Sequence, residues 1–417
     1  MKWNRIWLIF ALHIMATASL LEAQELGAQK AGVVDLKASD GTLLKATYFP
    51  AAKPGPGVLL FHQPNRTRKA WDDVAGQLAA AGIHTLTLDI RGFGESGGKP
   101  YGKLADKEIE QSRNLWAGDI DVAWQYLASR PGVNADLIGL GGAGFDGVDN
   151  AVQIARRHPG AVKSLALLSG ETFLPGLRFL RQASHLPGLY VVADDDEYPP
   201  TADAMELLYI TSTCPEKKFI HYMGEKAAWK WFEIYEVGTV PATGSHGTDL
   251  FKIHPDLPAT IVDWFVTTLI RTPGHAPAGG NSPKDLPFAP IINQLNEPGG
   301  ITQVTQQLLE GRRKDPTLQL FPEAMVNVLG GDYLRVNETK PAVELMKLNA
   351  LAYPESANAE DSLSDAYLAD GQNELALAHA RKALALLQSD TSDSQEWRDL
   401  ILKGANRKIT KLTGAQH

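Results

Sequence analysis

Cysteine is almost absent from this chain of 417 residues, which contains only Cys214. A single thiol cannot form an internal disulfide, and it has no C-x-x-C partner for redox chemistry. An excess of one charge is also missing, because the net charge of −8 is diluted over 417 residues. This charge gives no support for a nucleic-acid-binding surface. The length itself exceeds that of one typical domain.

Long hydrophobic runs are missing except at the start of the chain. Residues 1–5 carry Lys2 and Arg5, residues 6–21 are mainly apolar, and small residues follow. This order is typical of a secretory signal peptide and predicts one over residues 1–23, cleaved after Ala18 or Ala23. We therefore expect an exported protein, periplasmic or secreted, with a signal anchor as the alternative. No cysteine stands at a cleavage site to carry a lipid.

A nucleophilic side chain is missing where the pattern calls for one. Residues 138–147 read I-G-L-G-G-A-G-F-D-G, which predicts a strand, a sharp turn and then a helix. In the G-x-S-x-G elbow of esterases, the middle serine stands on such a turn. Here Gly144 takes the serine position, and no Ser, Thr or Cys occurs between Ala135 and Lys163. The serine mechanism therefore lacks its attacking atom.

A phosphate-binding loop is the other common use of a glycine-rich turn. That function needs a Lys-Ser/Thr pair directly after the turn, or a G-x-G-x-x-G near the first strand of its domain. No Lys-Ser/Thr directly follows Gly147, and this turn comes after several expected strands. Asp146 and Asp149 would also repel a phosphate at the start of the helix. The sequence thus predicts no nucleotide or other cofactor and no metal.

Apolar runs of strand length alternate with helical patterns in the first two thirds of the chain. This alternation predicts an α/β domain with a mainly parallel sheet covered by helices on both faces. The expected strands lie at residues 57–62, 83–89, 137–140, 164–168 and 189–193, and the expected helices at 71–81 and 115–127.

Several motifs occur in an informative order: His62 after a strand, L-D-I-R-G-F-G-E-S-G over residues 88–97, and the elbow. Together they resemble the α/β-hydrolase superfamily, with the dienelactone-hydrolase and serine-aminopeptidase-like branches most similar. The resemblance covers residues 32–271 and implies a hydrolase domain over 30–272. It also implies hydrolysis of ester or amide bonds by an intact member.

The resemblance further implies a set of site residues. In the family the acid and the histidine follow the nucleophile in chain order, which points to Asp196 after a strand and to His246 in a G-S-H-G loop. The oxyanion donors would be the backbone amides of Phe145 and Gln63, since Pro64 has no N–H. Gly144 is the vacant nucleophile position.

Asp146 offers an alternative nucleophile, because some α/β-hydrolases attack with an aspartate. This would shift the elbow to residues 144–148 and place the bulky Val148 where a small residue is preferred. The simpler interpretation is a capping or solvated aspartate in the first turn of the helix.

Prolines and glycines cluster at residues 273–290, which predicts a linker. Beyond it, residues 291–417 show only helical patterns. Tyr333 and Ala342 recur 34 residues later as Tyr367 and Ala376. This period resembles tetratricopeptide repeats, at about 323–356 and 357–390, with flanking helices near 301–313 and 395–412. An ordinary pair of helical hairpins is the alternative.

Three functions fit these features. The first is an exported hydrolase-like protein that is catalytically silenced and acts in binding or scaffolding, with a small molecule or peptide in its pocket. The second is a working hydrolase that uses Asp146 or a water activated by His246. The third is a plain interaction module whose repeat-like domain binds a protein or peptide.

Overall fold

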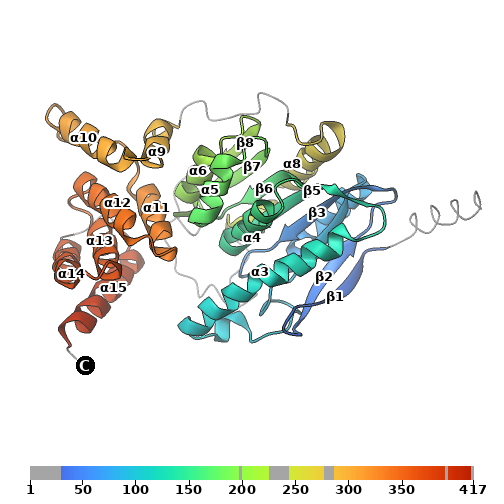
Figure 1. The fold of residues 1–417 in the computed structure, drawn as a ribbon, viewed down its shortest axis with the longest axis horizontal. Coiled ribbons are helices and arrows are strands. Elements are labelled where there is room, and N and C mark those ends of the chain that lie inside the picture. The colour runs from blue at the N-terminus through green and yellow to red at the C-terminus, as the bar shows by residue number, and fades with distance from the viewer. Residues whose placement is uncertain (1–29, 197–199, 225–243, 277–285, 390–392, 415–417) are drawn as a thin grey trace, which may run out of the picture.

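The computed structural model describes residues 30–196, 200–224, 244–276, 286–389 and 393–414. They form a sheet domain and a helical domain, which lie side by side (Figure 1). The predicted signal peptide at residues 1–23 lies outside the described residues. Among the described helices, none combines the length and apolar character needed to cross a membrane.

The sheet has eight strands in the order β1-β2-β4-β3-β5-β6-β7-β8. β2 runs antiparallel to β1 and β4, and all other neighbouring strands are parallel. This arrangement confirms the predicted mainly parallel sheet. The strands are β1 Gly32–Lys37, β2 Leu43–Phe49, β3 Gly55–Phe61, β4 His84–Leu88, β5 Val133–Ala143, β6 Val162–Leu168, β7 Gly188–Ala193 and β8 Lys217–Tyr222.

Helices cover both faces of the sheet, as predicted, because strands buried on both sides need two apolar layers. In β3, Leu59 and Phe61 face one core, whereas Val58 and Leu60 face the other. The first face carries α3 Asp106–Ala128, α4 Gly144–Arg157, α5 Leu174–Gln182 and α6 Pro200–Thr211, and the second carries α2 Asp72–Ala80 and α8 Leu257–Val266. Short helical segments are η1 Arg68–Trp71, η2 Tyr101–Lys103, η3 Gly247–Asp249, α7 Leu250–Ile253 and η4 Thr267–Arg271.

The C-terminal part is helical throughout its described residues. Two consecutive helix pairs occupy the ranges expected for the two repeats, and Ala342 and Ala376 are fully buried where helices approach each other. Whether these pairs are tetratricopeptide repeats stays a prediction. The helices are α9 Ala289–Leu295, α10 Gly300–Arg312, α11 Glu323–Arg335, α12 Thr339–Ala352, α13 Ala357–Ala369, α14 Asn373–Leu387 and α15 Gln395–Thr413. The first of them begins two residues inside the predicted linker.

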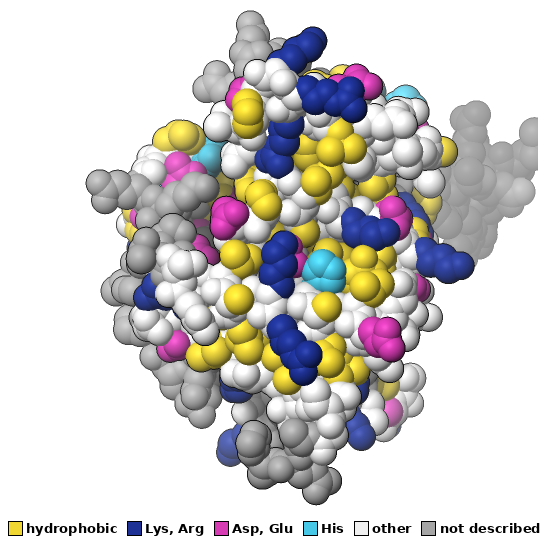
Figure 2. Space-filling model, turned by 90° about the vertical axis from the view of Figure 1, so that its left-hand side faces the viewer, with side chains coloured by type: hydrophobic (Ala, Val, Ile, Leu, Met, Phe, Trp, Pro, Cys, Tyr) yellow, Lys and Arg dark blue, Asp and Glu magenta, His cyan; other side chains and the backbone are white. Residues whose placement is uncertain are grey.

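The helical domain is docked on the first face of the sheet domain. Met325 and Leu329 of α11 and Ile292 of α9 belong to the same apolar core as the α5 and α6 side chains. At the rim, Arg178 of α5 forms a bidentate pair with Glu338, at 2.7 and 2.8 Å. A shared core of this kind holds two domains together more firmly than exposed ion pairs do. Figure 2 shows the outer end of the helical domain, where hydrophobic side chains lie between Lys and Arg side chains.

Candidate functional site

The predicted elbow is present, and its turn is at Gly144. β5 ends at Ala143, α4 begins at Gly144, and the φ of Gly144 is +65°. This left-handed conformation is favourable for glycine and strained for other residues. Close packing beneath the turn falls on Gly147, where a Cβ would lie 2.9 Å from the carbonyl oxygens of both Phe61 and His62.

Asp196 and His246 meet at the carboxyl edge of the sheet, beside Gly144. The Nδ1 of His246 lies 3.1 Å from both carboxylate oxygens of Asp196, and both side chains are buried. The Nε2 of His246 lies 3.0 Å from where a Cβ on Gly144 would be. The neighbouring Asp194 instead pairs with His221 at 2.6 Å. The structure thus brings together the three residues that chain order selected.

The strand order, the left-handed turn after β5 and a histidine–carboxylate pair at the same sheet edge occur together in one fold family. The N-terminal domain has the α/β-hydrolase fold. No protein-family model and no curated protein matches the chain. Solved structures resemble the hydrolase domain at low identity, so the likeness concerns the fold and gives no information about the reaction.

Three of these solved structures illustrate the range of identities. The dienelactone hydrolase from Anabaena variabilis is 18% identical, with a TM-score of 0.39, over 58% of this chain and 98% of its own. A dienelactone hydrolase-like promiscuous phosphotriesterase from metagenomic libraries is 16% identical, with a TM-score of 0.42, over 58% of this chain and 100% of its own. The Pyrococcus furiosus esterase Pf2001 is 14% identical, with a TM-score of 0.41, over 58% of this chain and 92% of its own.

Gln63 fills the space next to Gly144 that a nucleophile would need. A Cβ on Gly144 would overlap the Cβ of Gln63 and lie 3.1 Å from its Cα. The Gln63 side chain is fully buried and bound to the histidine loop. Its Nε2 donates to the carbonyl of His246 at 3.1 Å, and its Oε1 accepts from the amide and hydroxyl of Thr248 at 3.1 and 2.8 Å. Gln63 therefore joins the β3 loop to the histidine loop across the vacant position.

His62 holds the loop that carries Gln63. Its Nε2 accepts from the amide of Ile90 at 3.1 Å, so its Nδ1–H donates to the carbonyl of Gln63 at 2.7 Å. Burial lowers the pKa of His62, which keeps the ring neutral in this tautomer. The histidine that helped to identify the fold thus has a structural role here.

The two predicted oxyanion donors lie beside the elbow. Phe145 is the second residue of α4, where backbone amides have no partner within the helix. Gln63 borders Gly144 from the opposite loop. Their proximity fits the expected arrangement, and their action as donors stays a prediction.

Asp146 is not at the turn, so the shifted elbow of the aspartate alternative is not formed. It lies in the first turn of α4, and its Oδ1 is 3.4 Å from Nη2 of Arg113 on α3. Burial raises the pKa of Asp146 to about 6, and the charge of Asp149 adds to the shift, while Arg113 and Arg335 oppose it. The carboxylate thus faces α3 and the helical domain.

The helical domain also reaches the elbow, which the sequence did not indicate. Nη1 of Arg335, at the end of α11, donates to Glu171 and to Asp332 at 3.0 Å each. Its guanidinium lies over the rings of Phe145 and Phe173, at 5.4 and 4.7 Å from their centres. Burial raises the pKa values of Glu171 and Asp332, the latter to about 8. No local motif could reveal contacts between residues so far apart in the chain.

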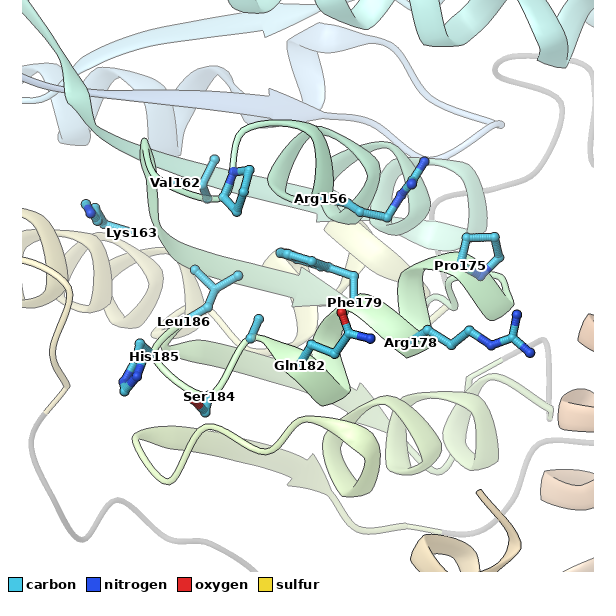
Figure 3. Close-up of a pocket in the computed structure, with 12 residues that line it drawn as sticks. Arg156, Val162, Lys163, Pro175, Arg178, Phe179, Gln182, Ser184, His185 and Leu186 are labelled. Carbon is cyan, nitrogen blue, oxygen red and sulfur yellow. The ribbon is translucent and has the colours of Figure 1, made fainter. Parts of the chain in front are cut away.

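Two large cavities lie on the α3–α4–α5 side of the hydrolase domain rather than at Gly144. One, of about 690 Å³, lies between α4, β6 and α5, with the Phe179 ring between Val162 and Gln182 (Figure 3). The other, of about 680 Å³, lies between α3, α4 and the end of α11. Neither is lined by Gly144, Asp196 or His246. Among the described residues, no group of His, Cys, Asp and Glu side chains is arranged to hold a metal ion.

Proposed function

We propose that this protein is an exported α/β-hydrolase-type protein whose serine mechanism is disabled and which works by binding or scaffolding. The observation that carries the proposal is the contact of Gln63 with Gly144. The nucleophile is absent, and its space is taken by a buried side chain with three hydrogen bonds. Nucleophilic catalysis needs an attacking atom within reach of its base, and this arrangement supplies none at residue 144.

The retained pair of His246 and Asp196 fits this proposal as a structural feature. The backbone of the histidine loop is fixed by Gln63, and the imidazole is fixed by Asp196. In a serine–histidine pair the hydroxyl oxygen stands about 2.6–3.2 Å from the imidazole nitrogen. Here a Cβ on Gly144 would overlap Gln63 and lie only 3.0 Å from Nε2, so a serine does not fit unless Gln63 is removed and the imidazole gives way slightly.

The helical domain supports a role in binding. Its helix pairs have the lengths and period that resemble tetratricopeptide repeats, which bind peptides and proteins through an extended surface. Several of its helices expose large apolar side chains, which a partner could cover. These exposed residues are Leu309, Leu351, Leu375, Leu400 and Leu402. Export follows from the sequence of residues 1–23 and is tested by locating the protein in cell fractions.

Fluorophosphonate labelling of the full chain tests the silencing. We expect no labelling of the wild type and none of Gly144→Ser alone, because the new Cβ would overlap Gln63. The double variant Gln63→Gly/Gly144→Ser removes that overlap and places a hydroxyl beside His246. We expect slow but measurable labelling of this variant.

The added substitution His246→Ala is the matched control and should abolish labelling of the double variant. Labelling of the wild type would disprove the proposal. Ester turnover by the wild type that disappears on Asp146→Asn would instead show that Asp146 is the nucleophile. If the double variant keeps its circular dichroism spectrum and its thermal unfolding but remains unlabelled, His246 and Asp196 are not the remnant of a triad.

A further inference from the structure

The cavity between α3, α4 and the end of α11 has the properties of a ligand site. Its volume of about 680 Å³ falls within the range of about 300–1,000 Å³ that is typical of small-molecule pockets. Both domains contribute to it, since Arg335 and Val336 line it together with residues of the hydrolase domain. It is separate from the vacant nucleophile position, because Gly144, Asp196 and His246 do not line it.

Two buried N–H donors on its wall have no partner in the described part of the chain. Nδ2 of Asn150 and Nε1 of Trp116 make no hydrogen bond, although these residues are only 4% and 5% exposed. Buried donors are almost always satisfied, and an indole nitrogen can only donate. Both residues line the cavity, so a small shift of either side chain would bring its N–H group to the oxygen acceptor of a bound molecule.

The charges on the wall favour an anion. Four arginines line the cavity against two aspartates, Asp146 and Asp149. Asp149 already accepts hydrogen bonds from Thr172 and Gln153, at 2.6 and 3.0 Å. The four arginines are Arg113, Arg156, Arg157 and Arg335. Arg113, Arg157 and Arg335 already pair with Asp146, Asp121 and Glu171, respectively. Arg156 instead donates to the neutral Gln153 at 2.9 Å, so its charge is available to a ligand.

We propose that this cavity binds a small organic carboxylate. Its oxygen atoms would accept from Asn150 and Trp116, and Arg113 and Arg156 would balance its charge. Trp116 and the Phe173 ring supply apolar surface for the body of the ligand. Since Arg335 belongs to the helical domain, an occupied cavity also strengthens the contact between the two domains.

Asp146 gives the site a characteristic pH dependence. The charged groups around it are Arg113 on α3, Asp149 on α4, Glu171 after β6 and Arg335 on α11. A carboxylate bound nearby favours the protonated form of Asp146, so binding takes up a proton. With a pKa of about 6 in the empty site, affinity should fall as the pH rises from 6 to 8.

Isothermal titration calorimetry of the full chain tests this site with three probes of similar shape. At pH 6 we expect benzoate to bind at least about tenfold more tightly than neutral benzamide, and benzylammonium to bind more weakly than both. Raising the pH to 8 should weaken benzoate binding several-fold, and Asp146→Asn should remove this pH dependence.

Variants of the wall distinguish the site from general adsorption. Arg156→Gln, at an exposed residue whose loss leaves the fold intact, should weaken benzoate binding about tenfold, as should Arg113→Gln. Arg381→Gln, on the exposed side of α14, is the matched control and should have no effect. Equal binding of benzoate and benzamide, preference for benzylammonium, insensitivity to Arg156→Gln, or no heat with benzoate would each overturn the proposal.

Discussion

Asp332 offers a sharp test of how the two domains meet, because it is a carboxylic acid without exposure to solvent. It lies on α11, and its Oδ1 accepts from Arg335 at 3.0 Å. Its Oδ2 has no hydrogen-bond partner in the described part of the chain. Burial raises the pKa of Asp332 from 3.8 to about 8, and the charge of Glu171 adds to the shift. The folded protein therefore holds a proton here at neutral pH.

The sign of the effect on stability follows from proton uptake. Between pH 3.8 and 8 the folded state binds more protons at Asp332 than the unfolded state does, so the free energy of unfolding falls as pH rises. At pH 7 the pH lies about three units above 3.8, the pKa of Asp332 in the unfolded chain, which corresponds to roughly 4 kcal/mol. Relaxation of the neighbouring Arg335 and Glu171 reduces this figure. We expect Asp332→Asn to raise the free energy of unfolding by about 1–4 kcal/mol at pH 7.

Urea unfolding of wild type and variant at several pH values measures this gain. Circular dichroism at the helical band reports on both domains, and the difference between the two proteins cancels the titration of all other groups. The gain should be largest at pH 7–8 and should fall to about 1 kcal/mol near pH 4.5, because this pH lies close to the unfolded pKa of 3.8.

The control is Asp315→Asn, at an exposed aspartate with the opposite shift. Hydrogen bonds from the hydroxyl and the amide of Thr317 lower the pKa of Asp315. Its replacement should therefore give no gain in stability at neutral pH. A loss of stability in Asp332→Asn at pH 7, or a gain that is equally large at pH 4.5, would refute the argument.

Two further predictions concern glycine positions and can be checked by the same unfolding experiments. Gly147→Ala should destabilise the protein by about 1–3 kcal/mol, because its Cβ would press on two backbone carbonyls. Gly76→Ala has no atom near its Cβ and should stabilise α2 by about 0.5–1 kcal/mol. Equal effects of the two substitutions would contradict the packing argument. Gly144→Ser and Gln63→Gly should each destabilise the protein, and their combination should cost less than the sum by about 0.5–3 kcal/mol; strict additivity would show that the two residues do not compete for one space.

The fold could be predicted wherever the strands are buried on both faces. β3, β4, β6 and β7 are buried along almost their whole length, and the pattern placed each of them within two residues of its observed bounds. The outer strands β1, β2 and β8 were not identified, because they are half exposed and mix polar with apolar residues. α3 begins at Asp106, nine residues before its predicted start, since its first turns are polar.

At the site, chain order was sufficient to select Asp196 and His246, because a strand end marks the first and a glycine-rich loop marks the second. Gln63 was considered only for its backbone amide. Its side-chain contacts reach the histidine loop, 183 and 185 residues away in the chain, and such contacts leave no local signal. Arg335 was missed for the same reason, since it meets Glu171 across 164 residues.

The contact between Gly144 and Gln63 opposes any side chain at position 144. Glycine at position 144 has no Cβ, so the loop after β3 can approach and bury Gln63 against the turn. Once buried, Gln63 satisfies its amide through the histidine loop, and its removal would leave those partners unpaired. A serine at 144 then meets a filled space, while a change at 63 alone leaves a void without a nucleophile. On the proposed function, both positions must therefore change together before His246 can activate a hydroxyl at residue 144.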